Sequence, residues 1–149
     1  MSEVSVNDLL SRYDVFLLDA YGVIVSTAGA LPGAAELLER IRGAGKQFVV
    51  LTNDASRLPE TIVRRFVGFG LEVELARIVT SGMLLAPHFA ECGLTGARSI
   101  VMGPDDSVRY VEQAGGKPVS TSEEDVSVVV VCDDDGYDVR QGLDEVITV

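Results

Sequence analysis

Apolar residues fall along the chain in two patterns, which predict two kinds of element. Short, mainly apolar runs are typical of strands buried in a parallel sheet. These runs lie at residues 15–18, 47–51, 99–102 and 128–131. Between them, apolar residues recur at the spacing of helices packed on a sheet, for example at Ala34, Leu37, Leu38 and Ile41. Strands alternating with helices predict an α/β fold: a three-layer, Rossmann-like parallel sheet with helices on both faces, in a single domain over residues 1–149.

The first apolar run ends at a carboxylate. Asp19 follows residues 15–18, which we expect to be buried on both faces, and Gly22 then allows a sharp turn. Open α/β sheets bind their ligands beyond the carboxyl ends of the strands. A strand-end aspartate also often caps a loop. On this stretch alone, capping and chemistry both remain open for Asp19.

The second apolar run ends in the polar residues Thr52 and Asn53. If the first two strands are neighbours, Asp19 and Thr52 share one crevice. An aspartate there can attack phosphorus or saturated carbon as a nucleophile. The Thr52 hydroxyl, the Asn53 amides and the backbone amides of the turn from Ala20 to Gly22 could donate hydrogen bonds to phosphate oxygens. A divalent ion would bridge Asp19 and the phosphate, although an ordinary strand-to-helix cap at residues 52–54 is the plainer alternative.

Charge and composition narrow the partners. The formal net charge of −11 disfavours nucleic acid and anionic membrane surfaces, because both repel an acidic protein. A phosphorylated substrate remains compatible, since one metal ion inverts the local charge. The chain opens on polar residues and holds no apolar run of spanning length, and Cys92 and Cys132 are expected to be buried thiols. These features predict a cytoplasmic protein.

The same residues resemble a known family. The run Asp19-Ala20-Tyr21-Gly22-Val23 resembles the first motif of the haloacid dehalogenase superfamily of hydrolases, and Leu51-Thr52-Asn53 resembles its second motif. Residues 31–46, 51–57 and 78–82 resemble the class IIA branch, which holds p-nitrophenyl- and pyridoxal-phosphate phosphatases and the nucleotide phosphatase of the N-acetylglucosamine operon. The resemblance covers nearly the whole chain.

This resemblance implies a magnesium-dependent phosphatase acting on a small phosphorylated metabolite. It implies that Asp19 is the nucleophile, forming an aspartyl-phosphate, and also a magnesium ligand. It implies a second metal contact from the backbone carbonyl of Tyr21, and phosphate binding by Thr52 and Asn53. The turn amides at Ala20 and Gly22 complete the predicted phosphate site.

Tyr21 departs from the family pattern. The family's phosphatases usually carry a second aspartate at this position, which protonates the leaving group and then activates water. A tyrosine with a reference pKa of about 10 is a poor base at neutral pH. We therefore expect Tyr21 to leave turnover weak or absent. The order Asp-Ala-Tyr-Gly is also that of the superfamily's 2-haloacid dehalogenases, whose halide leaves without an acid, so hydrolysis at carbon by Asp19 is an alternative.

The family's later lysine and acidic pair have no clear counterparts. Lys46 is expected at the wrong end of the sheet, while Lys117, Asp133, Asp134 and Asp138 mimic the later motifs. One interpretation is a compact, complete enzyme. The favoured one is the first half of a core, without the cap domain and the later strands, in which residues 15–18 have an open edge. Such an edge invites pairing, so a homo-oligomer is a further prediction. An incomplete core could also be a non-catalytic phosphate-binding or assembly module, which is an alternative prediction.

Overall fold

The structure is a computed structural model that describes residues 4–133. Its residue contacts group into two compact units. The first unit comprises Met1–Thr52 and Pro59–Val79, and the second comprises Asn53–Leu58 and Thr80–Val149. Within the described residues, no helix is long and apolar enough to cross a membrane.

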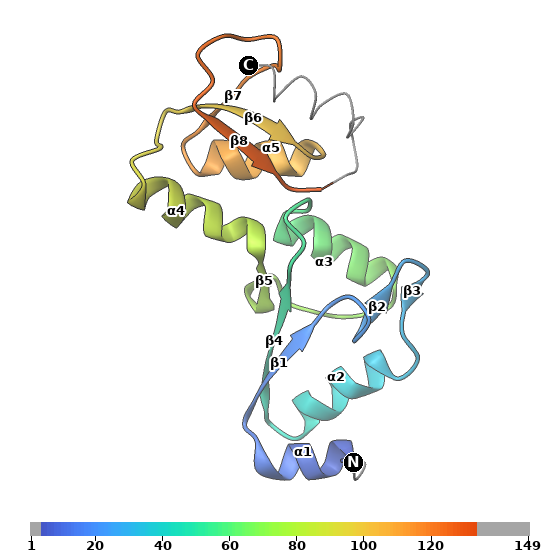
Figure 1. The fold of residues 1–149 in the computed structure, drawn as a ribbon. Helices are drawn as coiled ribbons and strands as arrows, with labels where there is room; N and C mark the ends of the chain where they lie inside the picture. The colour runs from blue at the N-terminus through green and yellow to red at the C-terminus, as the bar shows by residue number, and fades with distance from the viewer. Residues whose placement is uncertain (1–3, 134–149) are drawn as a thin grey trace. The chain divides into compact units, whose positions relative to one another are not determined.

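The first unit is built on a three-stranded sheet with strand order β1-β4-β5 (Figure 1). Its elements are α1 (Val6–Arg12), β1 (Val15–Asp19), β2 (Val25–Ser26), β3 (Gly29–Ala30), α2 (Ala34–Gly43), β4 (Gln47–Thr52), α3 (Pro59–Gly68), the 3₁₀ helix η1 (Leu75–Arg77) and β5 (Ile78–Thr80). Strands β1 and β4 run parallel, in a register from Val15↔Gln47 to Asp19↔Leu51. The predicted adjacency of the first two strands is therefore confirmed.

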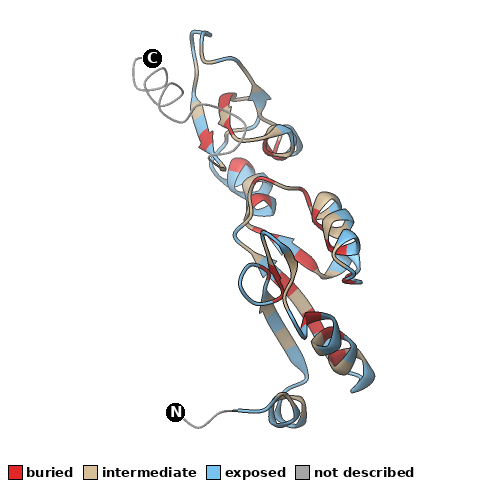
Figure 2. Ribbon diagram, turned by 90° about the vertical axis from the view of Figure 1, so that its right-hand side faces the viewer, coloured by how far each residue is buried: buried red, intermediate tan, exposed pale blue. Residues whose placement is uncertain are grey.

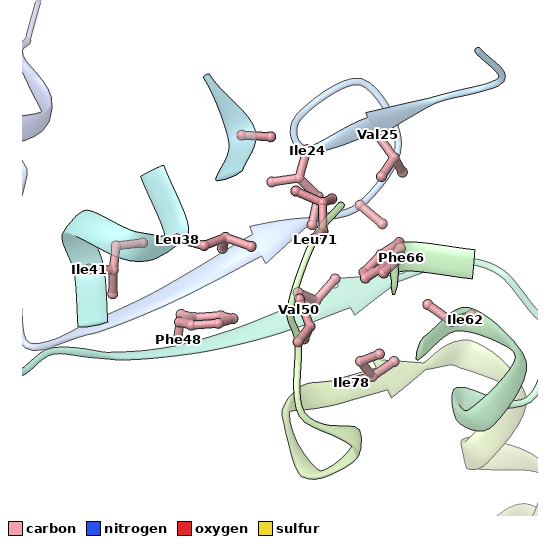
Figure 3. Packing of buried hydrophobic residues seen from close by; sticks show 13 residues of the cluster. Ile24, Val25, Leu38, Ile41, Phe48, Val50, Ile62, Phe66, Leu71 and Ile78 are labelled. Atoms are coloured by element: carbon pink, nitrogen blue, oxygen red, sulfur yellow. The ribbon is translucent and has the colours of Figure 1, made fainter. Parts of the chain in front are cut away.

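The core of the first unit lies between β4 and the helices (Figure 3). Phe48 and Val50 on β4 are fully buried, as are Leu38 and Ile41 on α2. These α2 residues belong to the stripe predicted from helical spacing. Each such side chain contributes roughly 1.5–3 kcal/mol when removed from water, so this layer fixes β4 firmly.

Strand β1 is less buried than the sequence predicts. Val15 is 57% exposed and Leu17 is 65% exposed, so one face of β1 is open (Figure 2). The prediction that residues 15–18 are buried on both faces is wrong. The physical reason is that the core packs against Phe16 and Leu18, on the other face of β1. Strand β1 also ends the sheet and pairs only with β4 among the described residues. The open edge agrees with the sequence analysis, while the homo-oligomer stays a prediction.

The second unit has its own parallel sheet, with strand order β7-β6-β8. Its elements are the 3₁₀ helix η2 (Ser81–Leu84), α4 (Leu85–Glu91), β6 (Arg98–Met102), α5 (Asp105–Gln113), β7 (Lys117–Pro118) and β8 (Val128–Val131). Phe89, Val111, Ala114 and Val130 form its apolar core. Pro87 lies in the first turn of α4, where proline is tolerated, and α4 begins two residues before it, after the 3₁₀ segment.

Three sequence expectations can now be judged. The α/β class with parallel strands is confirmed, but the strands form two larger sheets instead of one, besides the short β2–β3 hairpin. Strand β8 is exposed on one face, and the Cys92 thiol is exposed, so burial was predicted wrongly for both. The single-domain assignment of residues 1–149 stays a prediction. Asp134, Asp138 and a helix expected at residues 139–147 lie outside the described residues.

Candidate active site at the carboxyl edge of β1 and β4

Asp19 is the last residue of β1 and lies at the carboxyl edge of the first sheet. It continues the exposed face that Val15 and Leu17 begin, as the alternation of a strand requires. Its Oδ1 accepts a hydrogen bond of 2.8 Å from the backbone N–H of Ala20. One carboxylate oxygen thus helps shape the chain's exit from the strand.

The turn after Asp19 is held by backbone hydrogen bonds. The Ala20 carbonyl accepts from the N–H groups of Ile24 and Val25, and the Gly22 N–H donates to the Val25 carbonyl at 2.8 Å. Gly22 has a φ of +80°, which glycine adopts without the strain of a side chain. Tyr21 is 52% exposed at the tip of this turn. The backbone therefore fixes the turn and leaves the Tyr21 side chain free of the core.

Thr52 ends β4 next to this turn. Asp19 pairs with Leu51, so Thr52 stands one residue beyond the position opposite Asp19. Thr52 continues the face of Phe48 and Val50, whereas Asp19 continues the opposite face. The two residues thus flank the same edge of the sheet from its two faces. Their predicted roles as phosphate ligand and nucleophile stay predictions.

The segment from Asn53 to Leu58, called here the β4–α3 loop, belongs to the second unit. Asn53 is exposed and is the loop's first residue. Asp54 Oδ1 accepts from both the N–H and the hydroxyl of Ser56, at 2.8 and 2.7 Å. Arg57 donates to Asp54 Oδ2 at 3.0 Å. The acid of the loop is therefore committed to shaping it.

Residues of the second unit hold this loop from outside, and sequence reasoning missed them. They are Thr80, Ser81, Asp106, Ser107 and Tyr110. The sequence does carry one signal, since Asp105 and Asp106 form an acidic helix start. Nothing in the apolar pattern indicated that polar side chains would be buried here.

The donor set at the edge suits a hard cation only in part. Asp19 offers a carboxylate and Tyr21 a backbone carbonyl, both of the oxygen type that Mg²⁺ prefers. Mg²⁺ usually keeps several waters and takes one or two carboxylates together with substrate phosphate. Within residues 4–133, no group of three or more His, Cys, Asp or Glu side chains could hold a metal ion. The residues present fit a Mg²⁺ ion that takes few ligands from the protein and the others from water and a phosphate.

Lys46 does not lie at this edge. Lys46 precedes β4 and therefore lies at the amino end of the sheet, as the sequence predicts. Its ammonium forms an ion pair of 2.5 Å with Asp14, just before β1. The hydrogen bond and charge of Lys46 lower the pKa of Asp14 below its usual value. Lys117 begins β7 in the second unit and pairs in register with Arg98 at the amino end of β6. The compact-enzyme interpretation stays a prediction.

Fold and site together define a class. The chain is a Rossmann-like α/β protein whose candidate chemistry sits where a parallel strand ends in an aspartate.

Comparisons with known proteins give the family. The family model for haloacid dehalogenase-like hydrolases matches residues 16–117, and the chain belongs to that family. Human chronophin is 31% identical over 113 residues, which span 76% of this chain and 36% of chronophin. A 4-nitrophenylphosphatase of Schizosaccharomyces pombe is 28% identical over 54% of this chain and 27% of its own length.

Solved structures agree with this assignment. A possible sugar phosphatase of the HAD superfamily from Cytophaga hutchinsonii superposes with a TM-score of 0.88 at 26% identity. The match covers 99% of this chain and 54% of that one. The chain therefore spans about half the length of this structural relative, and a smaller share of the curated relatives. The resemblance to the p-nitrophenyl phosphatase branch, drawn from the motifs, is confirmed.

Proposed function

We propose that this chain hydrolyses phosphate monoesters, with Asp19 as the nucleophile. The observation that supports this most strongly is the register of β1 and β4, which places Asp19 and Thr52 at one carboxyl edge. Membership of a hydrolase family with phosphatase relatives supports the same reaction class. The substrate class we propose is a small phosphorylated metabolite.

The proposed reaction has two steps. An Asp19 carboxylate oxygen attacks phosphorus, the bond from phosphorus to the leaving oxygen breaks, and an aspartyl-phosphate forms. Water then attacks phosphorus, releasing inorganic phosphate and restoring Asp19. Thr52, Asn53 and the turn amides of Ala20 and Gly22 donate hydrogen bonds to the phosphate oxygens.

Mg²⁺, held by the Asp19 carboxylate and the Tyr21 carbonyl, would supply positive charge against the phosphate. Its proposal rests on the oxygen donors present at the edge. Tyr21 provides no strong acid at neutral pH, so the leaving group must depart as an anion or take its proton from water. Turnover should therefore be weak and should favour good leaving groups such as nitrophenolate. We propose the cytoplasm as the compartment, because Cys92 and Cys132 are free thiols.

The test is hydrolysis of p-nitrophenyl phosphate by the 149-residue chain with Mg²⁺. Release of nitrophenolate that EDTA abolishes and that Asp19→Asn removes would support the proposal. Asp14→Asn is a matched control, since Asp14 is an exposed aspartate just before the other end of the same strand. Equal loss of activity in both variants would indicate a general effect of charge and contradict the role of Asp19.

One observation favours a second function. The order Asp-Ala-Tyr-Gly at residues 19–22 lacks the acid that a poor leaving group needs, and a halide needs none. Incubation with 2-chloropropionate without metal, followed by halide measurement, tests this reaction at carbon. Phosphate binding without either reaction would instead support a non-catalytic phosphate-binding module.

A further inference from the structure

One face of α5 carries three polar groups that reach the β4–α3 loop. Asp106 Oδ2 accepts from the Leu58 N–H at 3.0 Å. The Ser107 hydroxyl donates to the Ala55 carbonyl at 3.2 Å. The Tyr110 hydroxyl donates to the Arg57 carbonyl at 2.9 Å. Since Tyr110 follows Ser107 by three residues and Asp106 by four, spacings that bring helical side chains together, one short stretch of α5 holds this loop at three points.

Tyr110 makes a second buried contact besides the one to the loop. It is only 4% exposed, and its hydroxyl also lies 2.5 Å from the hydroxyl of Thr80, which is 1% exposed. Because the single phenol proton goes to the Arg57 carbonyl, Thr80 is the donor and Tyr110 the acceptor in that bond. The result is a buried chain of hydrogen bonds from Thr80 through Tyr110 to the loop.

The side chains of α5 are tightly packed around these hydrogen bonds. A Cβ built on Gly82 would lie 2.5 Å from the Tyr110 ring, and one built on Gly103 would lie 2.6 Å from the Ser107 hydroxyl. Both glycines therefore let α5 approach closely. A fourth contact fixes the start of the loop, because the Ser81 hydroxyl donates to the Asn53 carbonyl at 2.7 Å.

The held loop begins at Asn53, directly after Thr52, and these are the two residues proposed to bind phosphate. Four backbone groups of the loop are tied by side chains of η2 and α5: the carbonyls of Asn53, Ala55 and Arg57 and the N–H of Leu58. A loop bound along its whole length keeps its first residue in place before a ligand arrives. Such preorganisation improves affinity because less freedom is lost on binding.

We propose that Tyr110 is a positioning residue, which fixes the β4–α3 loop and thereby its first residue Asn53, a proposed phosphate ligand. The proposal rests on the proposed function and adds a dependence of phosphate affinity on the second unit. Tyr110 touches no substrate in this role. It acts through the Arg57 carbonyl and through Thr80.

The test compares Tyr110→Phe with Tyr13→Phe, which removes the hydroxyl of an exposed tyrosine. Two quantities are measured on the full chain: the affinity for inorganic phosphate by calorimetry, and the hydrogen exchange of the Ser56 and Leu58 amides. Tyr110→Phe should weaken phosphate binding by about 3- to 10-fold and speed loop exchange, the effect of one lost buried hydrogen bond. Tyr13→Phe should change neither.

A second pair of variants guards against a folding defect. Thr80→Val removes the other hydroxyl of the chain and should weaken phosphate binding as Tyr110→Phe does, whereas Thr80→Ser keeps the hydroxyl and should restore the affinity. Faster exchange with unchanged affinity would overturn the positioning role, because the bond would then serve stability alone. Unchanged exchange in Tyr110→Phe would overturn it as well. A wild-type chain that binds no phosphate would instead refute the proposed function, and the inference with it.

Discussion

The two loops that follow β1 and β4 are built differently. The turn from Ala20 to Val25 is shaped by backbone hydrogen bonds, and its tip residue Tyr21 is half exposed. The β4–α3 loop is held by side chains from elsewhere in the second unit, several of them buried. This difference means that Tyr21 can be exchanged with little effect on the fold, whereas Ala20, Ile24 and Val25 of the same turn are buried in the core of the first unit. The β4–α3 loop is less tolerant, since removing one partner leaves a buried polar group without a hydrogen bond.

The largest effect is expected from a substitution of Tyr21 in the turn after β1, on activity rather than on stability. Tyr21→Asp supplies the missing general base, which activates the water that attacks the aspartyl-phosphate, and should raise p-nitrophenyl phosphate turnover by about 10²–10⁴-fold. The midpoint of chemical denaturation should stay nearly unchanged, because Tyr21 is exposed. Steady-state kinetics and denaturation together check this. A large loss of stability would break the comparison, and unchanged turnover would show that Tyr21 does not limit the reaction.

The next effect is on the stability of the second unit. Gly82→Ala places a methyl group against the Tyr110 ring, whose hydroxyl is tied at both sides, so the ring cannot move away freely. Overpacking of this kind costs about 1–3 kcal/mol, measurable by urea denaturation. Gly43→Ala is the control, since a Cβ there meets nothing within 4 Å. Equal behaviour of the two variants would mean that the contact is loose.

A smaller loss is expected from the helix that holds the loop. Asp106→Ala leaves the Leu58 N–H without its acceptor and should lower the free energy of unfolding by about 1–2 kcal/mol, since the Asp106 side chain is only 13% exposed. Asp105→Ala removes the neighbouring, exposed carboxylate and should have much less effect. Loss of the same size in both would assign the effect to the charge of the helix start instead.

A fourth prediction concerns self-association through β1. The open edge and exposed apolar face of β1 should allow self-association at high concentration. Leu17→Lys should then lower the oligomer fraction in sedimentation velocity, since a charge on an edge strand opposes pairing. Val67→Lys, a similar change at an exposed site on α3, should not. A wild-type chain that stays monomeric throughout would exclude the homo-oligomer.

The smallest effect is expected at an exposed ion pair. Lys46 holds the pKa of Asp14 below its ordinary value, so the pair supports the fold above the unfolded pKa of about 3.9 and loses this support as pH falls through the lower, folded pKa. In an NMR titration, Lys46→Met should raise the pKa of Asp14. The pKa of Asp8, which is lowered chiefly by the Ser5 hydroxyl, should stay the same. A shift in both would point to a general change of charge.

The sequence predicted the elements and the edge that carries Asp19, because apolar runs and helical stripes report burial directly. Strand β1 and most of α2 lie where the patterns placed them. Exposure of Leu17 could not be read from its apolar type, since it depends on which face of the strand the core covers. The roles of Ser107 and Tyr110 were also beyond reach, because polar residues on a helix are normally exposed and only tertiary packing buries them here.

The central claim is that Asp19 carries the phosphoryl group during turnover. The most direct measurement is acid quenching of the Mg²⁺-loaded protein during p-nitrophenyl phosphate hydrolysis, followed by peptide mass spectrometry. We predict one phosphoryl group on the peptide that contains Asp19 and none in Asp19→Asn. Turnover at the wild-type rate in Asp19→Asn, or a phosphoryl group on another residue, would contradict the account.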